Sequence, residues 1–155
     1  MIMNWKLKKF EELSTDRLYE LLKLRFDIFV IEQQSIYPDL DDLDQKALHL
    51  LAYDEGIQQL TAYMRILPPD LSADGNTASF GRVVVSADAR GKGLARELVS
   101  RGLTIIQENW PLSVVSIEAQ YYLRDFYASF GFVVTSEPFL DAGVKHVEMQ
   151  LTRQK

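Results

Sequence analysis

The sequence predicts an α/β fold in which several short strands alternate with a few helices. Its 155 residues are 47% hydrophobic and 25% charged, which is the composition of one globular domain with a single core. Short β-branched runs bounded by turn residues predict strands, and apolar residues at helical spacing predict helices. Residues 79–101 join a strand, a glycine-containing turn and a helix, and the other elements are arranged around this unit. We therefore predict one domain that spans residues 1–155.

Composition excludes several classes of site and partner. The chain has no cysteine, which excludes disulfides, thiolate nucleophiles and zinc–thiolate sites. A formal net charge of −5 argues against nucleic-acid binding. No apolar run reaches the length of a membrane span, and the first residues lack the apolar region of a signal peptide. We expect a cytoplasmic protein with neither a nucleic-acid nor a membrane partner.

The chain begins with a predicted edge strand and a helix that carries one unusual arginine. Residues 4–10 alternate apolar and lysine side chains, which is typical of an edge strand with one solvated face. Residues 14–16, Ser-Thr-Asp, supply N-cap candidates for the helix. The apolar stripe of that helix consists of Leu18, Leu21, Leu22, Phe26 and Phe29.

Arg25 lies inside this apolar stripe, and a guanidinium that faces the core needs a partner. A nearby carboxylate, Glu32 or Asp27, or free backbone carbonyl groups would supply one. Arg25 is then either a structural clamp, which we favour, or a substrate contact at one end of a cleft.

An acidic loop follows, with Asp39, Asp41, Asp42 and Asp44 behind Pro38. It lacks the central glycine and terminal glutamate of an EF-hand, which excludes that calcium site. Two interpretations stay open. The loop is either a solvated turn, which we favour, or an electrostatic collar that attracts a protonated amine.

The rest of the chain is predicted as strands with two more helices. Residues 54–56, Asp-Glu-Gly, have the pattern of a hairpin turn. One helix follows residue 93, and a second covers residues 123–130 and ends at Gly131. Residues 139–143 are expected to be a plain connection. The predicted strands are residues 47–53, 57–67, 78–85, 114–119, 133–136 and 144–152.

The turn that precedes the first of these helices has the features of an anion-binding site. Residues 90–95, RGKGLA, follow a strand and lead into the helix. First-turn N–H groups lack intrahelical acceptors, and the helix dipole adds positive charge there. Glycines let a phosphate approach the backbone closely, and Arg90 and Lys92 add formal charge. The turn predicts a cradle for a diphosphate.

The pattern of this turn narrows the class of ligand. No Gly-Lys-Ser/Thr follows, so it is not a Walker loop, and Arg96 occupies the position of the third glycine in a dinucleotide fingerprint. It matches Arg-x-x-Gly-x-Gly/Ala at Arg90, Gly93 and Ala95. After a strand, this pattern resembles the acyl-CoA pyrophosphate loop of the GNAT acyltransferases.

Two other segments carry the same resemblance. Residues 126–132, FYASFGF, closely resemble the last helix of GNAT enzymes, and residues 24–33 are similar to the start of the ElaA-type branch of that superfamily. The predicted order, β-α-(short α)-β-β-β-α-β-α-β-β, is the GNAT topology, so the resemblance covers essentially the whole chain. It implies a mixed, mostly antiparallel sheet that is splayed at its centre and flanked by helices.

The resemblance also implies the cosubstrate and its contacts. Acetyl-CoA would be bound without a metal, its pantetheine arm and thioester by backbone groups of Val83, Val84 and Val85. Tyr127 matches the position whose hydroxyl typically faces the thioester sulfur, which makes it both a CoA contact and the candidate general acid. The pyrophosphate contacts would be Arg90, Gly91, Lys92, Gly93, Leu94 and Ala95.

The general base is left open at this point. Glu118 shares a strand face with Gln120 and is a candidate, acting directly or through water. Arg82 is an unusual cation in a central strand, and a pairing with Glu118 would keep that carboxylate ionised and weaken it as a base. His49 and His146 are further candidates, because histidine as a residue type titrates near neutrality, although a lone strand histidine is more often structural.

Together these features predict an acetyl-CoA-dependent N-acetyltransferase. It would move an acetyl or other acyl group to a primary amine of a small molecule or peptide by direct attack on the thioester. A non-catalytic acyl-CoA-binding regulatory module and an autoinducer-synthase-like acyltransferase stay open as alternatives. We expect a monomer or a homodimer. The predicted acceptor contacts are Arg25, Glu32, Arg82 and Gln120.

Overall fold

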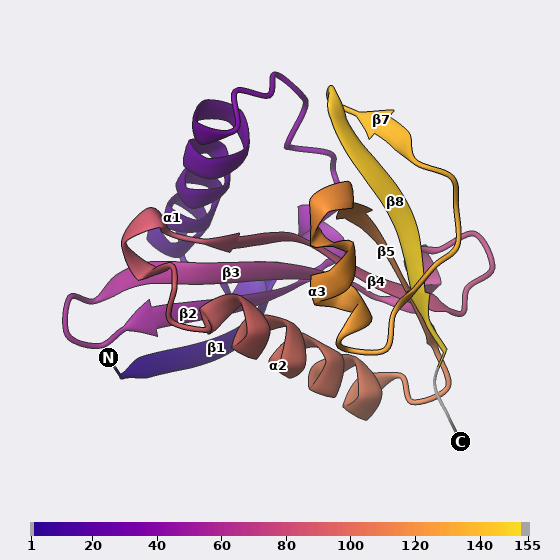
Figure 1. The fold of residues 1–155 in the computed structure, drawn as a ribbon. Coiled ribbons are helices and arrows are strands. Elements are labelled where there is room, and N and C mark those ends of the chain that lie inside the picture. The colour runs from indigo at the N-terminus through magenta and orange to yellow at the C-terminus, as the bar shows by residue number, and fades with distance from the viewer. Residues whose placement is uncertain (1, 153–155) are drawn as a thin grey trace.

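Eight strands form one mixed sheet in the computed structural model, which describes residues 2–152 (Figure 1). The strand order is β1-β2-β3-β4-β5-β8-β6, and β7 pairs with the other part of β8. Each pairing is antiparallel except that of β4 with β5. The strands are β1 (Met3–Lys9), β2 (Leu48–Asp54), β3 (Gln59–Leu67), β4 (Thr77–Val85), β5 (Val114–Gln120), β6 (Val133–Val134), β7 (Phe139–Asp141) and β8 (Val144–Leu151).

Three α-helices and several short turns of helix complete the fold. The side chain of Ser14 caps the first helix by accepting a hydrogen bond from the Arg17 N–H at 3.1 Å. Among the described residues no helix is both long and apolar enough to cross a bilayer. The helices are α1 (Thr15–Arg25), α2 (Leu94–Asn109), α3 (Arg124–Ala128), the π-helix η2 (Phe26–Glu32), and the 3₁₀ turns η1 (Phe10–Glu12), η3 (Asp44–Lys46), η4 (Pro69–Leu71), η5 (Ala87–Ala89) and η6 (Tyr121–Leu123).

Helices cover opposite faces of the sheet (Figure 1). Strand β2 shows why, because its buried residues alternate between two apolar cores. Leu50 and Ala52 join the core with α2, whereas Leu51 and Tyr53 join the core with α1. A strand that is buried on both faces needs an apolar side chain at nearly every position, and β2 has this pattern.

The sheet opens between β4 and β5. These parallel strands pair only at Thr77↔Val114 and Ala78↔Val115, near their starts. The hydroxyl of Ser113 reinforces this end by accepting a hydrogen bond from the Ala78 N–H at 2.9 Å. Beyond it the strands diverge, which confirms the predicted splay at the centre of the sheet.

A β-bulge in β4 lies beside this opening. Tyr63 pairs with Val84 and Arg65 with Gly81, so two residues of β4 face one residue of β3. Arg82, within the bulge, has a φ of 50°, which is unusual for a residue other than glycine. Because of the extra residue, side chains that would share one face of a regular strand point to opposite faces before and after the bulge. Phe80 belongs to the core with α2, whereas Val84 belongs to the core with α1.

Three local predictions need correction. Residues 139–143 are not a plain connection, because Phe139–Asp141 pair with β8 as a strand. The strand predicted at residues 133–136 is limited to Val133–Val134. Phe26 was expected to face the core, yet it is 50% exposed and Ile28 is buried instead. The chain enters a π-helix at Phe26, and its wider turn changes which residues face the sheet.

Candidate active site

A cavity of about 800 Å³ lies where the sheet opens. Its lining combines the apolar side chains of Phe80 and Ile117, which belong to the core with α2, with the polar side chains of Ser79 and Ser116 from the other face of the same strands. Alternate residues of a strand point to opposite faces. A cavity lined by both sets therefore passes through the sheet between β4 and β5.

The turn that was predicted to bind a diphosphate is exposed at the start of α2. Gly91 and Gly93 both have a φ of 78°, a left-handed conformation that favours glycine. Gly93 is the N-cap residue of the 16-residue helix, so the free N–H groups of the first turn follow it directly. Lys92 lies exposed between the two glycines. An anion at this turn meets backbone donors, the helix dipole and a lysine.

Arg90 of this turn already has two partners. Its Nη2 lies 2.8 Å from the Glu32 carboxylate, and its Nε donates to the Val85 carbonyl at 3.2 Å. Glu32, which was predicted to contact the acyl acceptor, is thus the ion-pair partner of Arg90 in this structure. The strand end predicted to receive the pantetheine arm, Val83 to Val85, lies beside the turn.

Tyr127 of α3 lines the cavity and is 7% exposed. Its ring packs against Phe80, Phe126 and Phe132 with centroid distances of 5.1–6.1 Å. Burial raises the pKa of its hydroxyl to about 12. The phenol is therefore protonated at neutral pH, which is the state that a proton donor requires.

Arg25 is completely buried, and its partners lie far along the chain. It donates to the Asp39 carboxylate through Nε at 3.0 Å, to the Asp39 carbonyl at 3.0 Å and to the Asp44 carboxylate at 2.8 Å. The two carboxylates expected as partners were wrong, because Asp27 pairs with Lys23 and Glu32 with Arg90. The alternative of a backbone carbonyl partner is confirmed at Asp39. With every contact internal, the position of Arg25 favours the clamp.

Two more arginines complete this buried network. Arg65 binds Asp41 with both Nη atoms, at 2.7 and 2.8 Å, and Asp44 at 3.1 Å. Arg82, in the bulge, forms ion pairs with Asp39 at 2.7 Å and Asp41 at 3.4 Å. The expected pairing of Arg82 with Glu118 is therefore wrong. The bulge turns the guanidinium toward the loop before β2 instead of toward β5.

This network also corrects both interpretations of the acidic loop. Three of its four carboxylates, those of Asp39, Asp41 and Asp44, bind arginines, and Asp42 remains exposed. Burial alone would raise the pKa of Asp41, but hydrogen bonds and charge from Arg65 lower it to about 2. Acids neutralised in this way form neither a solvated turn nor a free collar for a cation.

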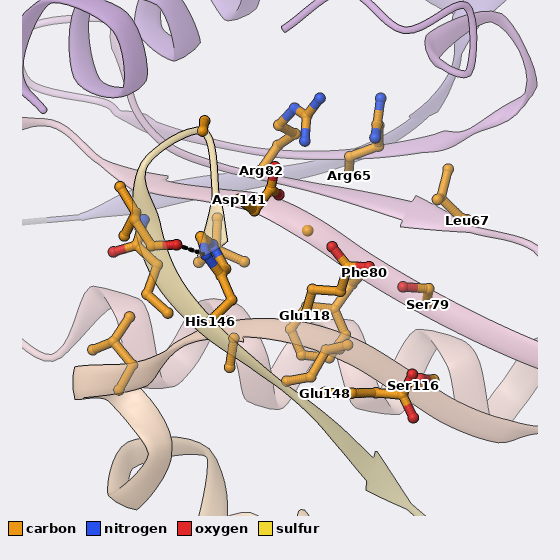
Figure 2. A pocket seen from close by; sticks show the side chains of 18 of the residues that line it. Arg65, Leu67, Ser79, Phe80, Arg82, Ser116, Glu118, Asp141, His146 and Glu148 are labelled. Atoms are coloured by element: carbon orange, nitrogen blue, oxygen red, sulfur yellow. Dashed lines mark hydrogen bonds between the residues drawn. The ribbon is translucent and has the colours of Figure 1, made fainter. Parts of the chain in front are cut away.

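The far wall of the cavity has acids without such partners (Figure 2). Glu118 of β5 faces Glu148 of β8 in the antiparallel register, and both line the cavity together with Asp141. Among the described residues no lysine or arginine forms an ion pair with any of these three acids. Gln120, next on the same face of β5, donates to the Gln33 side chain at 3.2 Å.

The two histidines occupy different environments. His49 is fully buried, with Nδ1 2.6 Å from the Tyr63 hydroxyl and Nε2 2.9 Å from the Asp44 carbonyl. Burial lowers its pKa. The His146 side chain lines the cavity, and its Nδ1 lies 2.7 Å from the Val144 carbonyl oxygen. Among residues 2–152 no group of three or more acidic or histidine side chains is arranged to hold a metal ion.

Several of these residues, including Arg65 and Glu148, were not predicted from the sequence. Arg65 carried a usable signal, because it is the one charge within the apolar run of residues 60–67. Glu148 carried another, because polar His146, Glu148 and Gln150 alternate with apolar residues along β8. The partners of each could not be read from spacing, because they come from distant segments.

Comparison with known proteins gives consistent matches over nearly the whole chain. Residues 23–153 match the family model described as an acetyltransferase (GNAT) domain. The chain is 37% identical to Protein ElaA of Escherichia coli over 150 residues, which cover 96% of this chain and 95% of that protein. It is 36% identical over 149 residues to a UPF0039 protein of Synechocystis, with 96% and 95% covered.

Solved structures agree with these matches. A crystal structure of an acyl-CoA N-acyltransferase from Pseudomonas aeruginosa has a TM-score of 0.89 at 36% identity, covering 99% of this chain and all of that one (100%). Escherichia coli ElaA has a TM-score of 0.89 at 35% identity, with the same coverage. The CoA-dependent acyl-homoserine lactone synthase BjaI, at 20% identity and a TM-score of 0.75, shares the fold, covering 96% of this chain and 82% of the synthase.

Proposed function

The chain belongs to the GNAT acetyltransferase family, and from this membership we propose that it transfers an acetyl group from acetyl-CoA to a primary amine of a small molecule or peptide. The observation that carries the proposal is the cavity that passes through the sheet beside Tyr127. A thioester that enters from the α2 side meets, within this opening, an amine that enters from the polar side.

The cosubstrate would lie along the α2 side of the opening. Its diphosphate would bind the N–H groups after Gly93 and the charge of Lys92, and its pantetheine arm would follow Val83 to Val85. The bulge supports this placement, because it interrupts the pairing of β4 with β3 next to these valines. Backbone groups freed from a ladder are available to a ligand.

Tyr127 would serve as the proton donor for the leaving thiolate. Attack of the amine on the thioester carbonyl gives a tetrahedral intermediate, and its collapse breaks the C–S bond. The thiolate then takes the phenol proton, and the tyrosinate recovers a proton from the acetylated nitrogen. A buried phenol that lines the cavity and is protonated at neutral pH has a proton to donate.

The acceptor would enter along the wall formed by Glu118, Asp141 and Glu148. A primary amine with a pKa near 10 arrives protonated at neutral pH, since unperturbed lysine has a pKa of about 10.4. Carboxylates without ion-pair partners favour such a cation over a neutral or anionic acceptor. The arginines of the opposite wall do not oppose this preference, because each is bound to aspartates.

Thiol detection of free CoA, with acetyl-CoA and a library of primary amines, tests the proposal. We expect release that depends on the amine, with an acetylated product by mass spectrometry. Tyr127→Phe is the matched variant, because it keeps the ring packing and removes the hydroxyl. We expect turnover to fall by about a hundredfold while affinity for CoA stays the same. Tight CoA binding without transfer to any amine would instead indicate the non-catalytic module.

A further inference from the structure

His146 of β8 has a fixed tautomer. Its Nδ1 lies 2.7 Å from the Val144 carbonyl oxygen, and a carbonyl only accepts hydrogen bonds. Nδ1 therefore carries the hydrogen, and in the neutral ring Nε2 has a free lone pair. Among the described residues Nε2 has no hydrogen-bond partner, and the side chain lines the cavity (Figure 2).

The ring is also held in place by an aromatic contact. It stacks on Phe139 of β7 with a centroid distance of 6.0 Å and an interplanar angle of 23°. Phe139 is its register partner on one side, and Gln120 of β5 is its partner on the other. A ring that is fixed by stacking and by a short hydrogen bond presents Nε2 in one direction, which a proton acceptor requires.

His49 supplies an internal contrast. Its Nε2 donates to the Asp44 carbonyl and its Nδ1 accepts from the Tyr63 hydroxyl, so both nitrogens are occupied. It is 0% exposed and lies within the arginine–aspartate network. His146 is therefore the one of the two histidines that has a nitrogen available to a substrate.

Three acids of the same wall line the cavity together with His146. Glu118 lies on β5 two residues before Gln120, the register partner of His146, Asp141 comes from β7, and Glu148 lies on the same face of β8. On its own strand Lys145 points elsewhere, with Nζ 3.9 Å from the centre of the Tyr121 ring. Across the cavity Asp41 is neutralised by arginines.

We propose that Nε2 of His146 is the general base that deprotonates the acceptor ammonium; this inference rests on the proposed function. The proton moves from the ammonium nitrogen to Nε2, which gives an imidazolium and a free amine whose lone pair attacks the thioester. The imidazolium then releases the proton to solvent. Positive charge stays beside the same acids throughout, so the transfer does not separate the charge from the carboxylates that stabilise it.

The matched variants are His146→Asn and His146→Gln. Asparagine places an amide near the position of Nδ1 and keeps the donation to the Val144 carbonyl, and glutamine places one near Nε2. Neither side chain is basic. We expect both to reduce kcat/KM for the acceptor by about a hundredfold at pH 7, with unchanged affinity for CoA and partial rescue by added imidazole.

The pH profile separates a base from a structural role. Without the base, the rate follows the fraction of free amine, which increases about tenfold per pH unit up to the amine pKa. We expect the ratio of wild-type to variant kcat/KM to shrink as pH rises. A ratio that is constant with pH, or a variant with wild-type activity, would overturn the assignment.

A second measurement does not depend on turnover. The chain has two histidines, so ¹⁵N shifts of their rings can be assigned with the His146→Asn variant. We expect His146 to carry its hydrogen on Nδ1 and to shift when an amine substrate is added. A hydrogen on Nε2 would overturn the assignment. If the wild type transfers acetyl to no amine, the proposed function fails; if it transfers and the pH profiles match, only the role of His146 fails.

Discussion

The acids on two sides of the same cavity differ in whether they form ion pairs. On one side, which we call the paired wall, Asp41, Arg65 and Arg82 line the cavity. Asp39, Asp44 and Arg25 lie behind them in the same network of ion pairs. On the wall of β5, β7 and β8, the open wall, Glu118, Asp141 and Glu148 line the cavity without ion-pair partners among the described residues.

This difference suits two separate roles, one in holding the shape of the opening and one in binding the acceptor. The arginines and aspartates of the paired wall neutralise one another, and their contacts join α1, the loop, β3 and the bulge of β4. The open wall keeps a like-charged pair, Glu118 opposite Glu148, although such pairs destabilise a sheet. We infer that the paired wall holds the shape of the opening, and that the open wall meets the acceptor.

Asp44→Asn should have the largest effect on stability. The Asp44 carboxylate accepts from Arg25 at 2.8 Å and from Arg65 at 3.1 Å, so its loss leaves two buried cations short of a partner. Removing one partner of a buried ion pair costs about 3–5 kcal/mol. Urea unfolding should show a loss of this size, whereas exposed Asp42→Asn should change little. Equal stability of the two variants would contradict a structural paired wall.

The second-largest expected effect is a loss of stability at low pH, as the carboxylates of the paired wall become protonated. The pKa of Asp41 is lowered to about 2, chiefly by Arg65 against the opposing effect of burial. A carboxyl with a lowered folded-state pKa contributes stability above its unfolded pKa, which is about 3.9, and loses it as the pH falls toward the folded value. We expect the free energy of unfolding to decrease between about pH 4 and pH 2. Asp41→Asn should have lower stability at neutral pH and a flatter profile in this range.

The smallest expected effect comes from an exposed ion pair at the turn before α2. Arg90 is paired with Glu32 at 2.8 Å, and both side chains are more than two-fifths exposed, at 43% and 42%. Exposed pairs contribute about 0–1 kcal/mol. Glu32→Gln should free Arg90 for the diphosphate and remove a repelling charge. CoA affinity, measured by calorimetry, should increase by about two- to fivefold. Weaker binding would show that Glu32 supports the cradle instead.

Much of the fold could be predicted because its signals are local. The strand, glycine turn and helix at residues 79–101 lie within one stretch, and the strand and helix patterns need no distant information. The splay at the centre of the sheet was expected from a family resemblance that rests on contiguous motifs, and the short pairing of β4 with β5 confirms it.

The paired wall could not be predicted because the partners within it are distant in sequence. Arg25 reaches Asp39 and Asp44 across 14 and 19 residues, while nearer acids bind other cations. The π-helix that begins at Phe26 sets the direction in which the loop departs. Arg82 points toward the loop because of one extra residue in β4. Spacing identifies that a buried arginine needs an acid, but the path of the chain decides which acid.

The most direct test is the acceptor KM of the double variant Glu118→Gln with Glu148→Gln, measured with a cationic amine at low and at high salt. We expect KM to increase by about tenfold, or about 1.4 kcal/mol, with less dependence on salt than in the wild type. Stability should be unchanged or higher, because two opposed like charges are removed. An unchanged KM, or a loss of stability as large as that of Asp44→Asn, would contradict the assignment of the open wall to the acceptor.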